Sequence, residues 1–124
     1  MQRRSIRFAN AALQQCFVDE LRRNAVPFTL SAVGAVECSE SEWAGVNSVA
    51  HTIRDGCFAW YFSWLDTPDD AARFAQALRA AALQFEVECH DGRDVFLLPR
   101  ADRSTHRRLF VESFCSSQDE SHEH

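Results

Sequence analysis

The segment FVDELRRNAVPFTL, residues 17–30, is matched 57 positions later by FAQALRAAALQFEV, residues 74–87. The two segments keep Phe, Leu, Arg and Ala in register, followed by an aliphatic residue, a second Phe and a further aliphatic residue. Random apolar composition would seldom preserve that order. Because self-similarity at a fixed spacing is typical of repeated supersecondary units, we interpret the two segments as parts of a duplicated structural unit.

Local signals extend the repeat on both sides of these segments. Asn10 and Thr67 also lie 57 positions apart, and both have side-chain oxygens that can accept from the first free amides of a helix. Pro68 follows at the favoured first helical position. After each helix, apolar and polar residues alternate up to a turn, which is typical of a strand hairpin. Each half is therefore predicted to run strand, helix, strand, strand, helix, with first strands over 4–8 and 58–65, hairpins over 28–38 and 85–98, and last helices after 39–42 and from about 101.

The expected strands place polar residues on one side. Arg7, Thr29, Ser31, Glu86 and Glu88 alternate with apolar neighbours. Such alternation indicates a sheet with one face covered by helices and the other open to water. We therefore expect an α+β fold, a two-layer sandwich built from a duplicated β-α-β-β-α unit, with about six strands and with helices on one face.

The length of 124 residues fits one domain. We expect a single α+β domain over residues 1–115, with halves at about 3–56 and 57–115. From residue 116 onward the sequence has no apolar residue to bury, so 116–124 is predicted to be a disordered acidic tail.

Composition narrows the classes of function. The formal charge of −5 argues against direct nucleic-acid binding, because phosphate binding requires a basic face, and it fits a basic protein partner better. The longest uncharged apolar run, 57–65, is far too short to span a bilayer, and the N-terminal sequence does not resemble a secretory signal. The five cysteines are scattered without a Cys-x-x-Cys pair, which favours a reducing, cytoplasmic location over a disulfide framework.

No pattern in the sequence is typical of an enzyme, a cofactor site or a metal site. Cys89 and His90 combine a thiol with a base, but neighbouring strand residues point to opposite faces, so catalysis is not expected there. His51 and His106 fall on predicted helices, where we expect structural histidines. The glycines form no phosphate loop, and the cysteines lack the close spacing of a zinc site.

The aromatic strand at 57–65 has two interpretations. Phe58, Trp60, Phe62 and Trp64 point one way, while Tyr61 and its alternate neighbours point the other. In the first interpretation the aromatic set fills the core beneath the helices. In the second, Trp60, Tyr61 or Trp64 is exposed and anchors a protein partner, because Trp and Tyr dominate interface hot spots. Tyr61 is the member that we expect to be exposed.

Acidic residues gather near the predicted hairpins and helix starts. Each taken alone is explained by a solvated surface or by helix capping. Glu86 and Glu88 on one strand face, with Asp91 and Asp94 beside them, would together form a negative patch suited to a basic protein. The predicted partner-binding residues are Glu86, Glu88, Asp91, Asp94, Tyr61, Trp64, Glu40 and Glu42.

The order helix, Leu-x-x-Asn-x-x-x-Phe, strand, Gly, strand, acidic helix start runs from Leu21 to Glu42. In this order the chain resembles small bacterial immunity proteins of contact-dependent growth inhibition systems. The resemblance covers about one third of the chain and rests on scaffold residues. It implies a cytosolic antitoxin that binds the C-terminal domain of a cognate toxin and occludes its active site, and this domain is expected to be a basic nuclease. A monomer that forms a one-to-one complex, without cofactor or metal, is expected on this basis.

Two other classes of function stay open. A small regulatory or ligand-sensing domain would use a pocket enclosed by the two halves, or would form a homodimer through the open sheet face. An enzyme of unrecognised type is the third interpretation, although no nucleophile and base, and no carboxylate pair, can be assembled from spacing.

Overall fold

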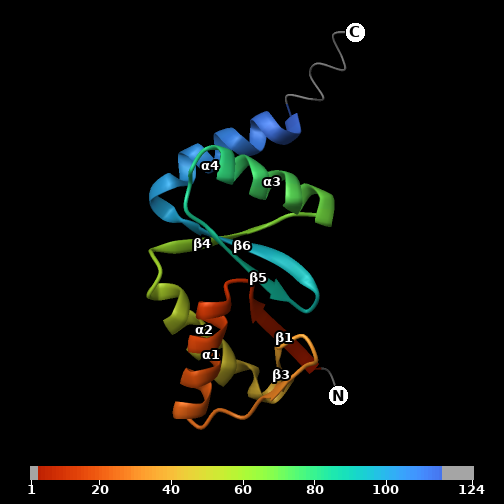
Figure 1. Ribbon diagram of the computed structural model, residues 1–124, viewed down its shortest axis with the longest axis vertical. Coiled ribbons are helices and arrows are strands. Elements are labelled where there is room, and N and C mark those ends of the chain that lie inside the picture. Colours follow the sequence, from red (N-terminus) through yellow and green to blue (C-terminus); the bar gives the residue numbers. More distant parts are fainter. Residues whose placement is uncertain (1–2, 116–124) are drawn as a thin grey trace.

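All six strands of the two halves form one open antiparallel sheet, in the order β2-β3-β1-β5-β6-β4 (Figure 1). The computed structural model describes residues 3–115, so the predicted tail at 116–124 lies outside the described residues. The first half contains β1 (Arg3–Phe8), α1 (Ala11–Arg23), β2 (Thr29–Leu30), β3 (Val36–Ser39) and α2 (Trp43–Asp55). The second half contains β4 (Trp60–Trp64), α3 (Pro68–Ala80), β5 (Glu86–His90), β6 (Arg93–Pro99) and α4 (Arg103–Phe110). Short helical turns at Glu40–Glu42, Arg100–Asp102 and Val111–Cys115 flank α2 and α4.

The predicted helix starts are confirmed. The Asn10 side chain accepts from the Ala12 and Leu13 amides at 2.9 and 3.3 Å, and the Thr67 hydroxyl accepts from the Asp70 amide at 3.1 Å. Free amides of the first turn are thereby satisfied.

The two helices also leave their last turns in the same way. Ala25 after α1 has φ 54° and Ala82 after α3 has φ 56°. These residues again lie 57 positions apart, and both adopt the left-handed conformation that often ends a helix. The duplication is therefore visible in the backbone as well as in the side chains.

Because each half contributes three strands, the second half is inverted relative to the first, so that its helices lie on the opposite face of the sheet. The equivalent orders are β2-β3-β1 and β5-β6-β4, joined where β1 pairs with β5. Every neighbouring pair in the sheet is antiparallel, so three strands per half leave β4 running opposite to its equivalent β1. A unit of the same handedness can continue the sheet in that direction only by presenting its other face.

The strand register shows this reversal. Ile6 and Phe8 of β1 belong to the hydrophobic core beneath α1 and α2, and they pair with His90 and Glu88 of β5. Val87, which alternates with them, packs against the other core, with α3. Helices α1 and α2 therefore lie on one face and α3 and α4 on the opposite face (Figure 1). The predicted α+β fold is confirmed. Within each half the helices cover one face of the sheet, as predicted, but the covered face of the first half is opposite to that of the second.

Each half has its own hydrophobic core. The first core is built from fully buried residues such as Ile6, Phe17 and Leu21, and the second from Phe74, Leu78 and their neighbours. The repeated Phe and Leu are thus scaffold residues, as the sequence indicates. None of the helices in residues 3–115 has the length and apolar character needed to cross a membrane.

Equivalent truncations should test whether the continuous sheet makes the halves one folding unit. Leu21→Ala and Leu78→Ala each remove a fully buried side chain and should each cost about 3 kcal/mol of unfolding free energy. In denaturant titrations followed by far-UV circular dichroism, both variants should shift one and the same transition. A transition that splits in two in either variant would contradict a single unit.

Candidate functional site

The most unusual surface is formed by alternate side chains of β4, which lies at one edge of the sheet. We call Trp60, Phe62 and Trp64 the aromatic face. Their ring centres are 4.9 and 6.1 Å apart along the strand. Trp64 is 48% exposed, while Trp60 and Phe62 are half-buried. Because β4 pairs with β6 in a register that places Tyr61 beside Leu98, Tyr61 and not the aromatic face points toward α3 and α4.

The core-filling interpretation of β4 is wrong, and in the second interpretation Trp64 is exposed as predicted but Tyr61 is not. The aromatic set does not fill the core beneath α3 and α4, because the second half is turned over and these rings lie on the face opposite its helices. Tyr61, expected to be exposed, is half-buried against α4 instead. Of the two aromatic residues predicted to bind a partner, Trp64 alone is strongly exposed.

The rings of the aromatic face are held by neighbours from α2 and β5. The Trp60 indole N–H donates to Asp55 at 2.7 Å, and the His51 ring lies 5.2 Å from Trp60. The His90 ring lies 5.6 Å from Phe62 and meets it edge-on. These contacts fix the rings before any partner binds.

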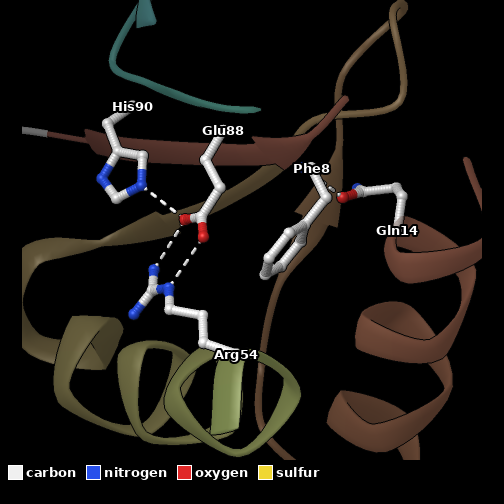
Figure 2. A network of polar contacts seen from close by, with 5 residues as sticks. All are labelled: Phe8, Gln14, Arg54, Glu88 and His90. Atoms are coloured by element: carbon white, nitrogen blue, oxygen red, sulfur yellow. Dashed lines mark hydrogen bonds and ion pairs between the residues drawn. The ribbon is translucent and has the colours of Figure 1, made fainter. Parts of the chain in front are cut away.

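A buried ion pair between Arg54, in the last turn of α2, and Glu88 of β5 lies next to the aromatic face. Figure 2 shows the side chains of this pair together with His90. Arg54 donates through Nε and Nη2 to the two carboxylate oxygens of Glu88, at 2.8 Å each. Both residues are fully buried. His90 Nε2 contacts the same carboxylate at 2.7 Å. The bidentate geometry joins a helix of the first half to a strand of the second.

The Arg54 guanidinium also stacks on the aromatic face. Its central carbon is 4.8 Å from the Phe62 ring centre and 5.4 Å from that of Trp60. Arg54 Nη1 is buried and has no hydrogen-bond partner among the described residues. The aromatic rings thus supply the favourable contact for the part of the cation that the carboxylate does not reach.

Glu88 is ionised within this network. Burial opposes the charge, but the hydrogen bonds from His90 and Arg54 and the positive charge of Arg54 outweigh it, so the pKa of Glu88 is lowered from its ordinary value.

The other predicted acidic residues do not form one patch. Glu88 is buried and cannot steer a partner. Glu42 closes a capping box by accepting from the Ser39 amide at 3.0 Å, and this hydrogen bond lowers its pKa. Asp91 and Glu40 meet at Arg4, with side-chain contacts of 3.3 and 3.4 Å. They are therefore already partly neutralised.

The remaining predicted carboxylates divide between the two faces. Glu86 is half-buried on the same side of β5 as Glu88. Asp94 is exposed, and together with Asp66 it lines a cavity at the start of α3. Asp66 also shares a cavity with Trp64 and Asp70. We call Asp66, Asp70 and Asp94 the acidic flank, because it lies beside the exposed end of the aromatic face. Arg73 and Arg93 line the same two cavities, and Arg93 contacts Asp66 at 4.0 Å, so the flank is partly neutralised as well.

A second polar pair lies on the opposite side of β4. The Tyr61 hydroxyl and His106 Nδ1 are 2.8 Å apart, and both residues line a cavity of about 220 Å³ with Ser63 and Arg103. His106 is 2% exposed, and burial lowers its pKa, which favours the neutral ring. Its Nε2 atom is buried without a hydrogen-bond partner among the described residues.

Arg54 and His90 are the site residues that sequence reasoning missed. Arg54 continues the four-residue spacing of Val46 and Ala50, so a charged residue on the inner face of α2 was the available signal. His90 is the last residue of β5 and lies on the same strand face as Glu88, so the period-two alternation was the available signal.

Comparison with known proteins found no matching family model, curated protein or solved structure. Within residues 3–115, no three His, Cys, Asp or Glu side chains lie close enough together to hold a metal ion.

Breaking the buried ion pair should be strongly destabilising. Arg54→Met or Glu88→Met alone leaves one buried charge without its partner and should cost about 3 to 5 kcal/mol of unfolding free energy. The double variant should lose less than the sum of the two, because it leaves no unpaired charge. Urea titrations of the four proteins measure the difference. Additive losses would show that the two side chains do not interact.

The lowered pKa of Glu88 predicts a specific loss of stability in acid. A carboxylate with a depressed folded-state pKa contributes fully above the unfolded value, about 4.3 for glutamate, and its contribution is lost as the pH falls through the folded value. Unfolding free energy measured from pH 7 downward should therefore fall below about pH 4.3 in the natural protein. The fall should be shallower in Glu88→Gln. Equal slopes in the natural protein and Glu88→Gln would contradict this role of Glu88.

Proposed function

We propose that this chain is a non-catalytic protein-binding protein whose contact surface is the aromatic face of β4. The observation that carries the proposal is a row of three aromatic rings on an edge strand, on the side that the helices of its own half leave free. Trp residues supply large contact areas and are enriched at interface hot spots. Exposed aromatic surface, here chiefly that of Trp64, often marks a site of protein–protein interaction.

The arrangement of the rings supports binding without a large ordering cost. The contacts of Asp55, Arg54 and His90 hold Trp60 and Phe62 in place. Only Trp64, at the exposed end, keeps a largely free surface. A contact surface that is ordered in advance loses less conformational entropy when it binds.

Charge favours a basic partner. The three carboxylates of the acidic flank outnumber Arg73 and Arg93 in the cavities beside Trp64, and the whole chain has a formal charge of −5. Such a surface raises the association rate with a positively charged protein and selects against acidic ones.

The more specific form of the proposal is an immunity protein that occludes the active site of a cognate toxin. A nuclease toxin must attract phosphates, so it presents Lys and Arg around its active site, and an acidic flank with an aromatic anchor is complementary to that surface. Inhibition would be steric and electrostatic, without turnover and without a cofactor.

A ligand-sensing role is the second candidate, and the cavity beside α4 is the observation that favours it. His106 presents a buried nitrogen without a partner next to the Tyr61 hydroxyl. Buried polar atoms are nearly always satisfied, so a small polar ligand at this cavity would complete the group. Unlike the pocket expected between the halves, this cavity lies within the second half.

The binding proposal is tested by inducing the C-terminal domain encoded immediately upstream, with and without this chain, and following growth. Growth should be restored by the natural chain, and the two proteins should co-purify. Trp64→Ala should weaken the complex by at least about 2 kcal/mol, as truncation of a hot-spot residue does. Binding is measured by isothermal titration calorimetry with the purified domain.

Val33→Ala is the matched control for this experiment, because Val33 is 74% exposed and lies in the hairpin beside β2, at the other end of the sheet. It should bind as the natural chain does. If this chain neither binds the upstream domain nor relieves its toxicity, the proposal of an immunity protein loses its support. Unchanged affinity in Trp64→Ala would exclude the aromatic face as the contact surface.

A further inference from the structure

The outer edge of β4 directs free backbone groups away from the sheet. The Arg100 amide donates to the Ala59 carbonyl at 2.8 Å, and Pro99, opposite Trp60, has no amide hydrogen to donate. Because hydrogen-bonded and non-hydrogen-bonded pairs alternate in an antiparallel ladder, Tyr61 bonds toward β6 and Phe62 turns its N–H and C=O outward. By the same alternation Trp60 and Trp64 also face outward. One of these groups is already used, since Arg100 Nε donates to the Trp60 carbonyl at 2.6 Å.

The equivalent edge of the first half, that of β1, is paired with another strand of this molecule. In the first half β5 covers the edge of β1, where the Ser5 carbonyl accepts from the Asp91 amide at 3.0 Å and the Ala9 amide donates to Val87 at 2.8 Å. The residue 57 positions after Ser5 is Phe62. The edge of β4 is therefore built like one that accepts an antiparallel strand, and no strand of residues 3–115 covers it.

Few features of β4 protect this edge from pairing. Natural edge strands are commonly blunted by charged residues, by proline or by a very short length. Strand β4 has the sequence WYFSW, without charge or proline, and is five residues long. The other edge strand, β2, has only two residues and offers little backbone for pairing.

The β4 residues whose backbone N–H and C=O groups point away from the sheet have the same order in both directions along the strand. Their order is Trp60, Phe62, Trp64, so an antiparallel copy centred on Phe62 sets Trp60 of one chain beside Trp64 of the other. We propose that β4 pairs with β4 of a second copy of this chain, about a two-fold axis at Phe62. The strand then matches itself in direction, register and side-chain type, as an isologous interface requires.

Apolar surface around the edge supports the second copy as the occupant. Trp64 on one face of the sheet and Phe110 on the other are both strongly exposed, and they line one cavity beside the end of β4. Cross-strand aromatic pairs stabilise an antiparallel ladder, and here the Phe62 rings would face each other directly. The Trp60 carbonyl keeps a second lone pair for the incoming amide, beside the Arg100 contact.

The dimer extends the proposed function without depending on it. Pairing through the backbone leaves the aromatic rings on one face and joins the rows of both chains into a single surface. The unit that binds a partner would then be a dimer with two equivalent contact surfaces, in place of the monomer that the resemblance implies. Self-association is measured on the purified chain alone, so its failure is distinct from a failure to bind a toxin.

Sedimentation equilibrium and amide hydrogen exchange test the proposal on the full chain. The mass should rise from one chain to two with concentration and then stop. Over the same range the Phe62 and Trp64 amides should gain protection, while the Tyr61 and Ser63 amides, bonded within the sheet, should be protected throughout. A single-chain mass at every concentration, with the Phe62 amide always unprotected, would overturn the proposal.

Paired variants separate the two edges of the sheet. Trp64→Asp places a charge at the β4 edge and should weaken dimerisation at least about tenfold, as edge charges oppose pairing. Val33→Asp, near β2, should leave it unchanged. Circular dichroism and thermal melts of each variant establish that it is folded. If Val33→Asp abolishes association, or if mass grows without limit while the Leu30 amide becomes protected, the chains pair head to tail and the two-fold dimer is wrong.

Discussion

Three strands per unit, in a sheet where every neighbour is antiparallel, form the constraint on which the rest of this structure depends. An odd count reverses the direction of equivalent strands, so the second unit can join the first only by turning over. Two separate hydrophobic cores follow, one on each face. A face without helices of its own also follows in each half. In the first half that face carries polar residues such as Ser5 and Arg7, and in the second it carries the aromatic face.

The reversal also explains why a fully charged pair is buried. The end of α2 extends beyond its own half and lies over the free face of the second, where Arg54 meets Glu88. A buried ion pair is weak evidence of net stabilisation, because removing two charges from water offsets most of their attraction. Its effect here is positional. The two hydrogen bonds between Arg54 and Glu88 fix the position of α2 relative to β5, and the guanidinium stacks on the rings of Phe62 and Trp60.

Local sequence patterns were sufficient for the repeat, the helix caps and the two faces of each strand. The Asn10 and Thr67 caps and the Glu42 capping box depend on residues within one turn, so they could be predicted. Period-two alternation showed that Trp60 and Trp64 share a face, but not which face the helices cover, because that depends on strand order. Glu88 had the same difficulty. Its partner lies 34 positions away in the sequence, and no local signal separates a solvated glutamate from a buried one.

The two ends of the sheet are unequal, and this inequality bears on how a duplicated unit ends. In repeat proteins each unit covers its neighbour, so the terminal units must be made polar, short or occupied. Strand β2 follows the second route, since it has only two residues. Strand β4 is neither polar nor short, because it has five residues, no charge and aromatic side chains at Trp60, Phe62 and Trp64. A unit whose equivalent edge accepts a strand inside the same chain therefore retains, at Phe62, the geometry to accept another. The duplication thus accounts for the fold of this protein and for an edge strand, uncovered within residues 3–115, that has the geometry to accept a second chain.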